Sequence, residues 1–238
     1  MDCKIKYYPD FEEKYLELIL SQNLILKRKE NIMTYISVRE VTPNAGKSGE
    51  VKSRVQRGAS IMSKHGSRAW ATQVMVGDGA GDFHVYGAYD NLKNASKSFQ
   101  EFSADPEMVT LMQEGQTDPA GVMRGPWVGR LMYGSPASSP MPVSVHRDYH
   151  LPRSGYPAVM ALASKLEGIM KPMGVEIAIG APLISHDHEM IRAIYRFSSL
   201  DHWGEAVDQM AENDEFAKLI NDAGEVGTLK KSRLMMNL

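Results

Sequence analysis

The sequence has a single cysteine, Cys3, among its 238 residues. One cysteine can form no disulfide within the chain and cannot build a cluster of thiolate metal ligands, so we expect a reducing, cytoplasmic setting. The chain also lacks an apolar run long enough to cross a membrane. Its lysines and arginines are spread along a chain of net charge −2, whereas nucleic acids and anionic membranes need a concentrated basic surface. We therefore predict no nucleic-acid partner and no membrane partner.

Two glycine-containing segments lack what nucleotide-binding motifs need. Residues 44–48 follow a predicted strand and open a predicted helix, as a phosphate-binding loop does, but Val41 occupies the position of the first glycine of that motif. Residues 77–82 join two predicted strands, so they have no helix N-terminus to hold a dinucleotide. We predict no nucleotide site at either segment.

What the chain does contain is an internal repeat. Residues 38–114 align with residues 146–222 at one constant offset of 108, without a gap. A chain of this length can form two domains of about 100 residues, each with its own core. We therefore predict a first repeat at 34–133, a linker at 134–141 and a second repeat at 142–238. The identical pairs lie where predicted elements change over, and they include Arg39 and Arg147, Val51 and Val159, Gly66 and Gly174, Leu92 and Leu200, and Leu111 and Leu219.

Residues 1–33 lie outside the repeat as a predicted leader. They lack the cleavage site and compact apolar segment of a secretory signal. Residues 27–31 can be encoded by purine-rich codons that resemble a bacterial ribosome-binding site, so we hypothesise that the leader is non-native and that translation of a bacterial gene starts at Met33. The alternative is an extra helix with an apolar face formed by Phe11, Tyr15, Leu16, Ile19 and Leu20.

Each repeat shows the periodicity of strand, helix, strand, strand, helix and strand. Gly66 and Gly174 are expected to end the first helix of each repeat, and Asn91 and Ser199 to cap the second. The second helix should turn its apolar residues inward, at Leu92, Ala95, Phe99 and Phe102 in the first repeat and at Leu200, Trp203, Val207 and Met210 in the second. The predicted strands are 34–42, 69–76, 83–89, 127–133, 143–150, 175–183, 190–197 and 229–236.

This order of elements is the split βαβ arrangement, in which helices cover one face of an antiparallel sheet. Residues 102–107 and 211–216 resemble the acidic helix restart of antibiotic-biosynthesis-monooxygenase and NIPSNAP-like domains, in the dimeric α+β barrel superfamily. The resemblance covers residues 34–238. It implies an α+β fold of two tandem ferredoxin-like βαββαβ repeats that form an intramolecular α+β barrel pseudo-dimer, with further homodimerisation left open. The superfamily includes cofactor-free monooxygenases, isomerases, haem-degrading enzymes and members without known activity, so it does not fix the function.

Candidate catalytic residues lie on the first strand of the second repeat. Alternation places His146, Asp148 and His150 on one face of that strand. A histidine beside a carboxylate suits proton transfer, with the carboxylate setting the tautomer. The alternative is that these are exposed or hydrogen-bonded strand residues without a catalytic role. The matching residues of the first repeat are less polar and include no histidine; they are Val38, Glu40 and Thr42.

Candidate ligand-binding residues lie on the third strand of each repeat. His84 and Tyr86 share one face in the first repeat, and Arg192 and Arg196 share the matching face in the second. The two arginines could hold a carboxylate or enolate oxygen through paired hydrogen bonds. The alternative is that they form salt bridges at an interface. We expect Trp70, Trp127 and Trp203 to be packed in the core.

We predict no metal site. His146 and His150 are too far apart along a strand, at about 13 Å, to share one ion. The cluster at residues 186–189 belongs to a predicted turn and is expected to be solvated. No cofactor is the first expectation, and haem is the alternative, in a haem or hydrophobic pocket lined by Met62, Met170 and Met173.

These features predict a small-molecule-binding protein whose ligand is apolar or aromatic. We expect its cavity between the sheet and the helices of the second repeat. Cofactor-free monooxygenase or isomerase chemistry would use His146, Asp148 and His150 near Arg192 and Arg196. The alternatives are a noncatalytic structural or assembly module, and a haem-binding protein.

Overall fold

The computed structural model describes residues 34–136 and 141–238. The leader, and with it the hypothesis of a start at Met33 or of an extra helix, lies outside the described residues, as does part of the linker. Within the described part, the same series of elements occurs twice. The first series is β1 (Tyr35–Pro43), α2 (Ser48–Lys64), β2 (Arg68–Gly77), β3 (Phe83–Tyr89), α3 (Leu92–Ala104), α4 (Pro106–Thr117) and β4 (Gly121–Tyr133).

The second series follows the same order. It consists of β5 (Val143–His150), α5 (Tyr156–Met170), β6 (Glu176–Ile184), β7 (Met190–Phe197), α6 (Leu200–Ala211), α7 (Asp214–Val226) and β8 (Thr228–Asn237), with short 3₁₀ turns at Arg153–Gly155 and Lys171–Met173. The eight predicted strands are all present, and β4 is the one that begins well before its predicted start. Local sequence signals therefore predicted the elements well.

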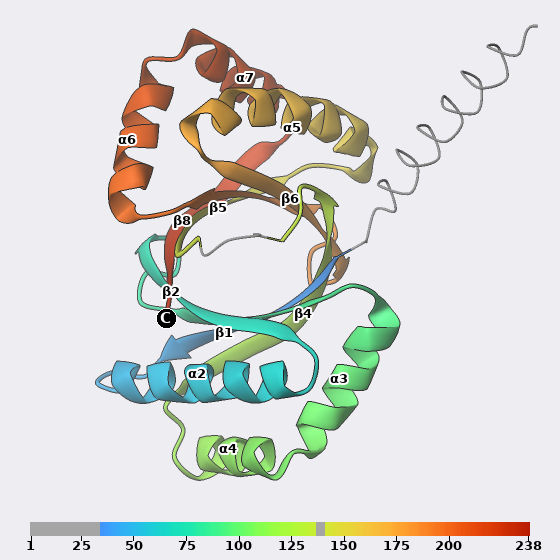
Figure 1. Cartoon of the computed structure of the whole chain (residues 1–238), viewed down its shortest axis with the longest axis vertical. Coiled ribbons are helices and arrows are strands. Elements are labelled where there is room, and N and C mark those ends of the chain that lie inside the picture. Colours follow the sequence, from blue (N-terminus) through green and yellow to red (C-terminus); the bar gives the residue numbers. More distant parts are fainter. Residues whose placement is uncertain (1–33, 137–140) are drawn as a thin grey trace, which may run out of the picture. The chain divides into compact units, whose positions relative to one another are not determined.

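The eight strands form one closed barrel in the order β1, β3, β2, β8, β5, β7, β6, β4 (Figure 1). All neighbouring strands are antiparallel. The sheet of the first series joins that of the second at both edges, through β2 with β8 and β4 with β6. Edge strands expose unpaired backbone groups, and these two seams satisfy them.

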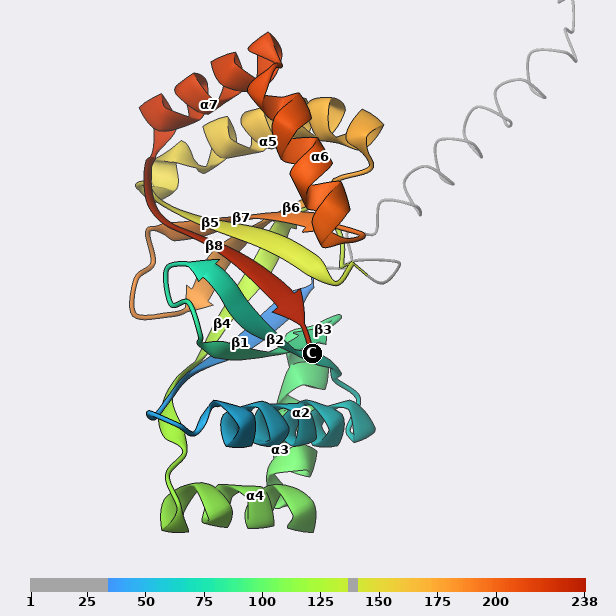
Figure 2. The ribbon, with the colours of Figure 1, turned by 90° about the vertical axis from the view of Figure 1, so that its left-hand side faces the viewer.

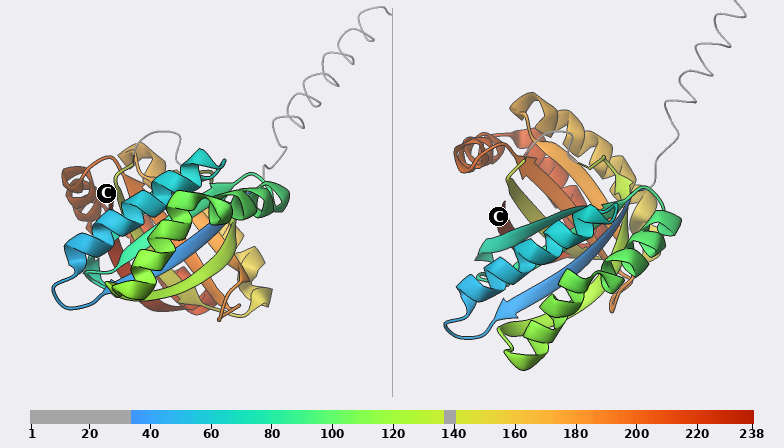
Figure 3. Two further views of the ribbon diagram at one scale, coloured as in Figure 1. Left: turned by 90° about the horizontal axis from the view of Figure 1, so that it is seen from below. Right: turned by 60° about the horizontal axis from the view of Figure 1, so that its bottom comes forward.

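The helices lie outside the barrel in two groups. Figure 2 shows α2, α3 and α4 on one side of the strands and α5, α6 and α7 on the other, and Figure 3 shows α2, α3 and α4 lying across the strands of their half. The predicted N-caps of the second helices are confirmed, because the side chains of Asn91 and Ser199 accept capping hydrogen bonds. Gly66 lies two residues beyond α2, and Gly174 follows the 3₁₀ turn that comes after α5; their φ values of 81° and 70° lie in the left-handed region that glycine tolerates.

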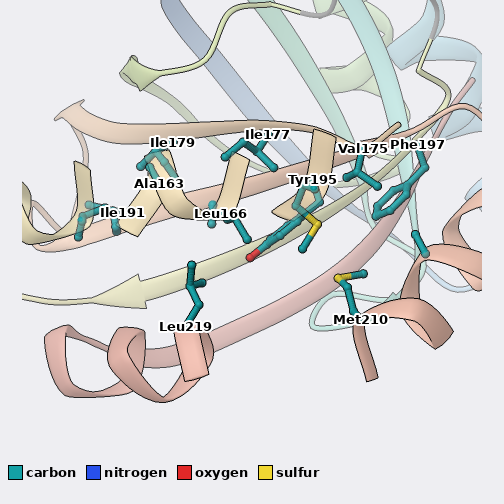
Figure 4. Packing of buried hydrophobic residues seen from close by; sticks show 14 of the residues in the cluster. Ala163, Leu166, Val175, Ile177, Ile179, Ile191, Tyr195, Phe197, Met210 and Leu219 are labelled. Atoms are coloured by element: carbon teal, nitrogen blue, oxygen red, sulfur yellow. The ribbon is translucent and has the colours of Figure 1, made fainter. Parts of the chain in front are cut away.

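Two separate cores fill the spaces between helices and sheet. In the first, Val51, Val55, Ala59 and Met62 of α2 pack against the strands as the periodicity predicted. In the second, side chains of α5, α6 and α7 meet those of β6 and β7 (Figure 4). Both cores lie on the outer face of the barrel, so its inner face is left for other residues.

The prediction for the second helix of each series was partly wrong. Phe102 is buried, but Leu92 and Phe99 are 46% and 51% exposed, because α3 packs through its C-terminal part. The matching residues of α6, Leu200 and Val207, are also exposed, whereas Met210 is buried. None of the described helices is long and apolar enough to span a bilayer.

Candidate functional site

The inside of the barrel encloses a cavity of about 1050 Å³. All eight strands contribute to its lining. We predicted the ligand cavity between the sheet and the helices of the second half. The space there measures only about 60 Å³ and is lined by core residues such as Leu166 and Leu219. The prediction of its place was wrong because α5 and α7 bring enough apolar side chains to fill the outer layer.

Asp148 is the centre of the charged part of the lining. Its carboxylate accepts two hydrogen bonds from Arg192, Nε to Oδ1 at 2.6 Å and Nη2 to Oδ2 at 3.0 Å, and one from Arg233, Nη2 to Oδ2 at 2.6 Å. Burial acts to raise the pKa of Asp148, but the two arginines outweigh it and lower that pKa. Asp148 is therefore an ionised anchor for two guanidinium groups and is not available as a proton donor.

Arg233 connects this anchor to the opposite half of the barrel. Its Nη1 lies 3.5 Å from Oε1 of Glu40, on β1. The same carboxylate lies 3.9 Å from Nε2 of His84 and 3.7 Å from Nη2 of Arg124. Glu40 is thus held by longer contacts than Asp148 is, although both side chains project into the cavity from matching strands.

His146 lines the cavity beside this network and is 6% exposed. Its Nε2 lies 3.3 Å from the Ser144 hydroxyl, while its buried Nδ1 has no hydrogen-bond partner among the described residues. Burial, and then the nearby charges of Arg192 and Arg233, lower the pKa of His146 well below its ordinary value. The imidazole is therefore neutral, and its buried Nδ1 lacks the hydrogen-bond partner that buried polar atoms normally have.

An aromatic group faces His146 from the first half. The Tyr86 ring packs edge-on against His146 at 6.1 Å between centroids and stacks on Trp70 at 5.1 Å. The Tyr86 hydroxyl pairs with Nδ1 of His84 at 3.0 Å. Burial raises the pKa of Tyr86 to about 12 and lowers that of His84 to about 2, so both groups are neutral.

The structure brings some of the predicted site residues together and separates others. His146, Asp148, Tyr86, Arg192 and Arg196 line the cavity. His84 is 1% exposed and does not line the cavity.

His150 lies apart from that group. Its Nε2 lies 3.4 Å from Glu189 and 4.0 Å from Asp187, with the side chain 41% exposed. The pairing of β5 with β7 stays regular as far as His150 and Met190, so His150 is separated from the other two predicted catalytic residues by its place as the last residue of β5.

Sequence reasoning missed several residues of the site. Arg233 was not among the predicted site residues, and Trp70 and Trp127 were expected in the core, but all three line the cavity. The available signal was the alternation of β8, which places Arg233 and Met235 on one face. The other missed group is the carboxylate of Glu40, which the offset of 108 pairs with Asp148.

No cluster of three or more His, Cys, Asp or Glu residues is placed to hold a metal ion within residues 34–136 and 141–238. The pocket predicted for haem from methionines is not formed, because Met62 and Met170 are 2% and 0% exposed and lie in the two outer cores. Met173 packs against the second of these cores. These residues do not fit a haem site.

Comparison with known proteins relates this geometry to a fold. No family model matches the sequence, and no curated protein matches it. Among solved structures, the chain is similar to a proposed monooxygenase from Lactobacillus acidophilus NCFM, with a TM-score of 0.60 and 9% identity over 86% of this chain and 94% of that one. An anthrone oxidase-like protein has a TM-score of 0.58 and 12% identity, over 88% and 92% of the chains. Chlorite dismutase from Candidatus Nitrospira defluvii has a TM-score of 0.52 and 10% identity, over 92% and 95%.

These neighbours are dimeric α+β barrel, or ferredoxin-like, proteins, so the resemblance seen in the sequence is confirmed at the level of the fold. The chain has an α+β fold with an eight-stranded antiparallel barrel. Sequence identities of 9–12% carry no activity from one protein to another, since one fold hosts many chemistries.

Proposed function

We propose that this protein binds a small aromatic or apolar molecule inside its barrel and that His146 accepts a proton from it, in a cofactor-free monooxygenase or isomerase reaction. The unpartnered Nδ1 of His146, buried in the cavity wall, carries this proposal. Similarity to a proposed monooxygenase and to an anthrone oxidase-like protein supports it at the level of fold. The stacked Trp70 and Tyr86 rings offer the ligand a flat apolar surface.

The chemistry requires a base, a cation and an apolar wall. Nδ1 of His146 takes a proton from an acidic C–H or O–H of the ligand, which leaves an enolate or phenolate. Arg192 and Arg233, fixed by Asp148, stabilise this developing negative charge. In an isomerase the imidazolium returns the proton to another atom of the ligand. In a monooxygenase the carbanion reduces O₂, so that a CH₂ group and O₂ become a C=O group and water.

We also propose that the barrel arose by tandem duplication of one ferredoxin-like βαββαβ unit, which makes it an intramolecular pseudo-dimer. Five of the seven pairs of matching elements begin 108 residues apart, as β1 and β5 do at Tyr35 and Val143 and α3 and α6 do at Leu92 and Leu200. A bacterial origin and a cytoplasmic location remain predictions, as does further homodimerisation.

Oxygen uptake with quinols, anthrones and polyketide-like phenols tests the enzyme hypothesis, with an assay of proton exchange for the isomerase. Turnover should be lost in His146→Gln and kept in His150→Thr, a control on the same strand whose side chain lies outside the cavity lining. If no such compound binds or reacts, the noncatalytic structural module becomes the better explanation. A Soret band on titration with haem would favour haem binding instead.

A further inference from the structure

We propose that the ligand of this barrel carries a carboxylate that pairs with Arg196, so that the substrate class is aromatic carboxylic acids. This inference rests on the proposed binding of an aromatic molecule inside the barrel and specifies its chemistry. Three features of the lining support it. The guanidinium of Arg196 has no carboxylate within hydrogen-bonding distance, it lies at a suitable spacing from His146, and the acids of the cavity already have cationic partners.

Arg196 differs from the other buried arginines of the cavity. Arg192 and Arg233 each donate to the Asp148 carboxylate at 2.6 Å, whereas no described carboxylate lies within hydrogen-bonding distance of Arg196. Its Nη1 donates to the backbone carbonyl of Ser135 at 2.9 Å, and its nearest acid, Glu176, lies 3.8 Å away.

The side chain of Arg196 is nevertheless only 14% exposed. Burial lowers its pKa more than the Glu176 carboxylate raises it. A buried guanidinium with free donor capacity favours an anion, and a planar carboxylate matches its geometry.

The position of Arg196 relative to His146 sets the length of the ligand. Arg196 lies opposite Ser144 in the pairing of β5 with β7, and Ile194 lies opposite His146. Arg196 and His146 therefore belong to residue pairs that are two residues apart, about 7 Å along the strands. This is close to the length of a benzoate ion. A carboxylate on Arg196 would present the far end of its ring to the imidazole, with the Ser144 hydroxyl between them, 3.3 Å from the ring nitrogen Nε2.

The other charges of the cavity do not oppose an incoming anion. Four acidic side chains line it, and each already has a cationic nitrogen at 2.6–3.5 Å; they are Glu40, Asp78, Asp82 and Asp148. Glu176, the acid that lies nearest to Arg196 among residues 34–136 and 141–238, does not line the cavity. A carboxylate at Arg196 therefore meets no unpaired carboxylate in the lining.

The experiment compares aromatic acids with their methyl esters, which keep the ring and remove the charge. Benzoate, 4-hydroxybenzoate and 2-naphthoate would be titrated by calorimetry and by fluorescence, since Trp70 and Trp127 line the cavity. We expect each acid that binds to do so about tenfold more tightly than its ester in the wild type. Arg196→Gln should remove this preference while leaving the affinity for the ester, and Arg196→Lys should restore part of it.

Two controls separate the role of Arg196 from general effects. Arg68→Gln changes another arginine of the lining, one that pairs with Asp90 and has a side chain 56% exposed, and it should leave the preference unchanged. His146→Gln should abolish turnover and also leave the preference unchanged. Thermal unfolding of each variant shows whether it folds. If Arg196→Gln does not fold, the inference is tested by Arg196→Lys and by the ratio of the affinities of the wild type for acid and ester.

The outcomes distinguish this inference from the proposed function. Equal affinity for acids and esters, or a preference that persists in Arg196→Gln, overturns the carboxylate assignment, while His146-dependent turnover of neutral compounds would leave the proposed function intact. If neither acids nor esters bind, both fail. A preference that depends on Arg196 alone supports both.

Discussion

The two halves of the barrel place different chemistry at matching positions of the cavity. In the second half, Asp148 lies opposite Arg192 in the pairing of β5 with β7 and forms a two-point ion pair with it at 2.6 and 3.0 Å. In the first half, Glu40 lies opposite His84 in the pairing of β1 with β3, and the closest contact between them is 3.9 Å, to a neutral ring. The acid at this place in the fold thus has a close ion pair with the facing residue in the second half, whereas in the first half it has only longer contacts, the shortest at 3.5 Å to Arg233.

The aromatic residues are distributed in the opposite way. The first half supplies Trp70 and Tyr86, where the offset of 108 gives Ala178 and Ile194 in the second. The second half supplies His146 where the first has Val38. One half therefore provides the stacked aromatic pair, and the other provides His146 and the arginines held by Asp148. The reaction that we propose would need a ligand that contacts both halves.

The ionic difference between the halves predicts the largest effect. Asp148→Asn leaves the buried charges of Arg192 and Arg233 without their main partner and should lower the free energy of unfolding by about 3–5 kcal/mol. Glu40→Gln removes only contacts of 3.5 Å and longer and should cost about 1 kcal/mol. Urea denaturation of both variants measures the difference. Equal losses in the free energy of unfolding would mean that the two acids contribute equally to stability.

The buried histidines predict a fall in stability on mild acidification. Burial lowers the pKa of His84 to about 2 and that of His146 well below its ordinary value, so the folded protein leaves both neutral. The unfolded chain binds a proton at each below about pH 6.5, so the free energy of unfolding should fall by about 1.4 kcal/mol per pH unit for each histidine. This loss begins before carboxylates titrate.

Unfolding curves between pH 6.5 and 4.5 measure that slope. His146→Val, which copies Val38 of the first half, should remove the share of one histidine, and His84→Gln should do the same. A slope that neither variant reduces would show that these rings are already protonated in the folded protein.

The sequence predicted the fold because its signals are local. Helix caps such as Asn91 and Ser199, and the alternation of Val143–His150, depend on neighbours within a few residues. The barrel seams, where β2 meets β8 and β4 meets β6, bring together strands far apart in the chain and leave no such local mark. For this reason the cavity was predicted outside the sheet rather than inside the barrel.

The candidate site could likewise be predicted only where its signals are local. Alternation correctly placed His146 and Asp148 in the cavity lining, but it does not show that His150, the last residue of β5, lies beside Glu189 instead. Arg233 contacts Asp148 across a strand pair that alternation alone cannot identify. The sequence also cannot show whether Arg192 is free to bind a ligand. In the structure, the closest hydrogen bonds of Arg192 go to Asp148.

The aromatic difference between the halves predicts a moderate effect on binding. Trp70→Ala gives the first half the residue that Ala178 provides in the second, and it removes the ring that stacks on Tyr86. We expect the affinity for an aromatic ligand such as 2-naphthoate to fall about tenfold, from lost stacking and buried area. Calorimetry measures this directly. Trp203→Phe, on α6 outside the cavity lining, is the control and should bind normally; an unchanged affinity in Trp70→Ala would argue against the aromatic wall.

The smallest effect is expected at His150, where the two halves should be interchangeable. His150→Thr copies Thr42 of the first half and removes contacts of 3.4 and 4.0 Å with Glu189 and Asp187. A side chain that is 41% exposed gains little from such pairs, so the free energy of unfolding should change by less than about 0.5 kcal/mol. Turnover should also be unchanged, because the ring does not line the cavity. Loss of turnover in this variant, with stability intact, would place His150 in the reaction and extend the site beyond the barrel interior.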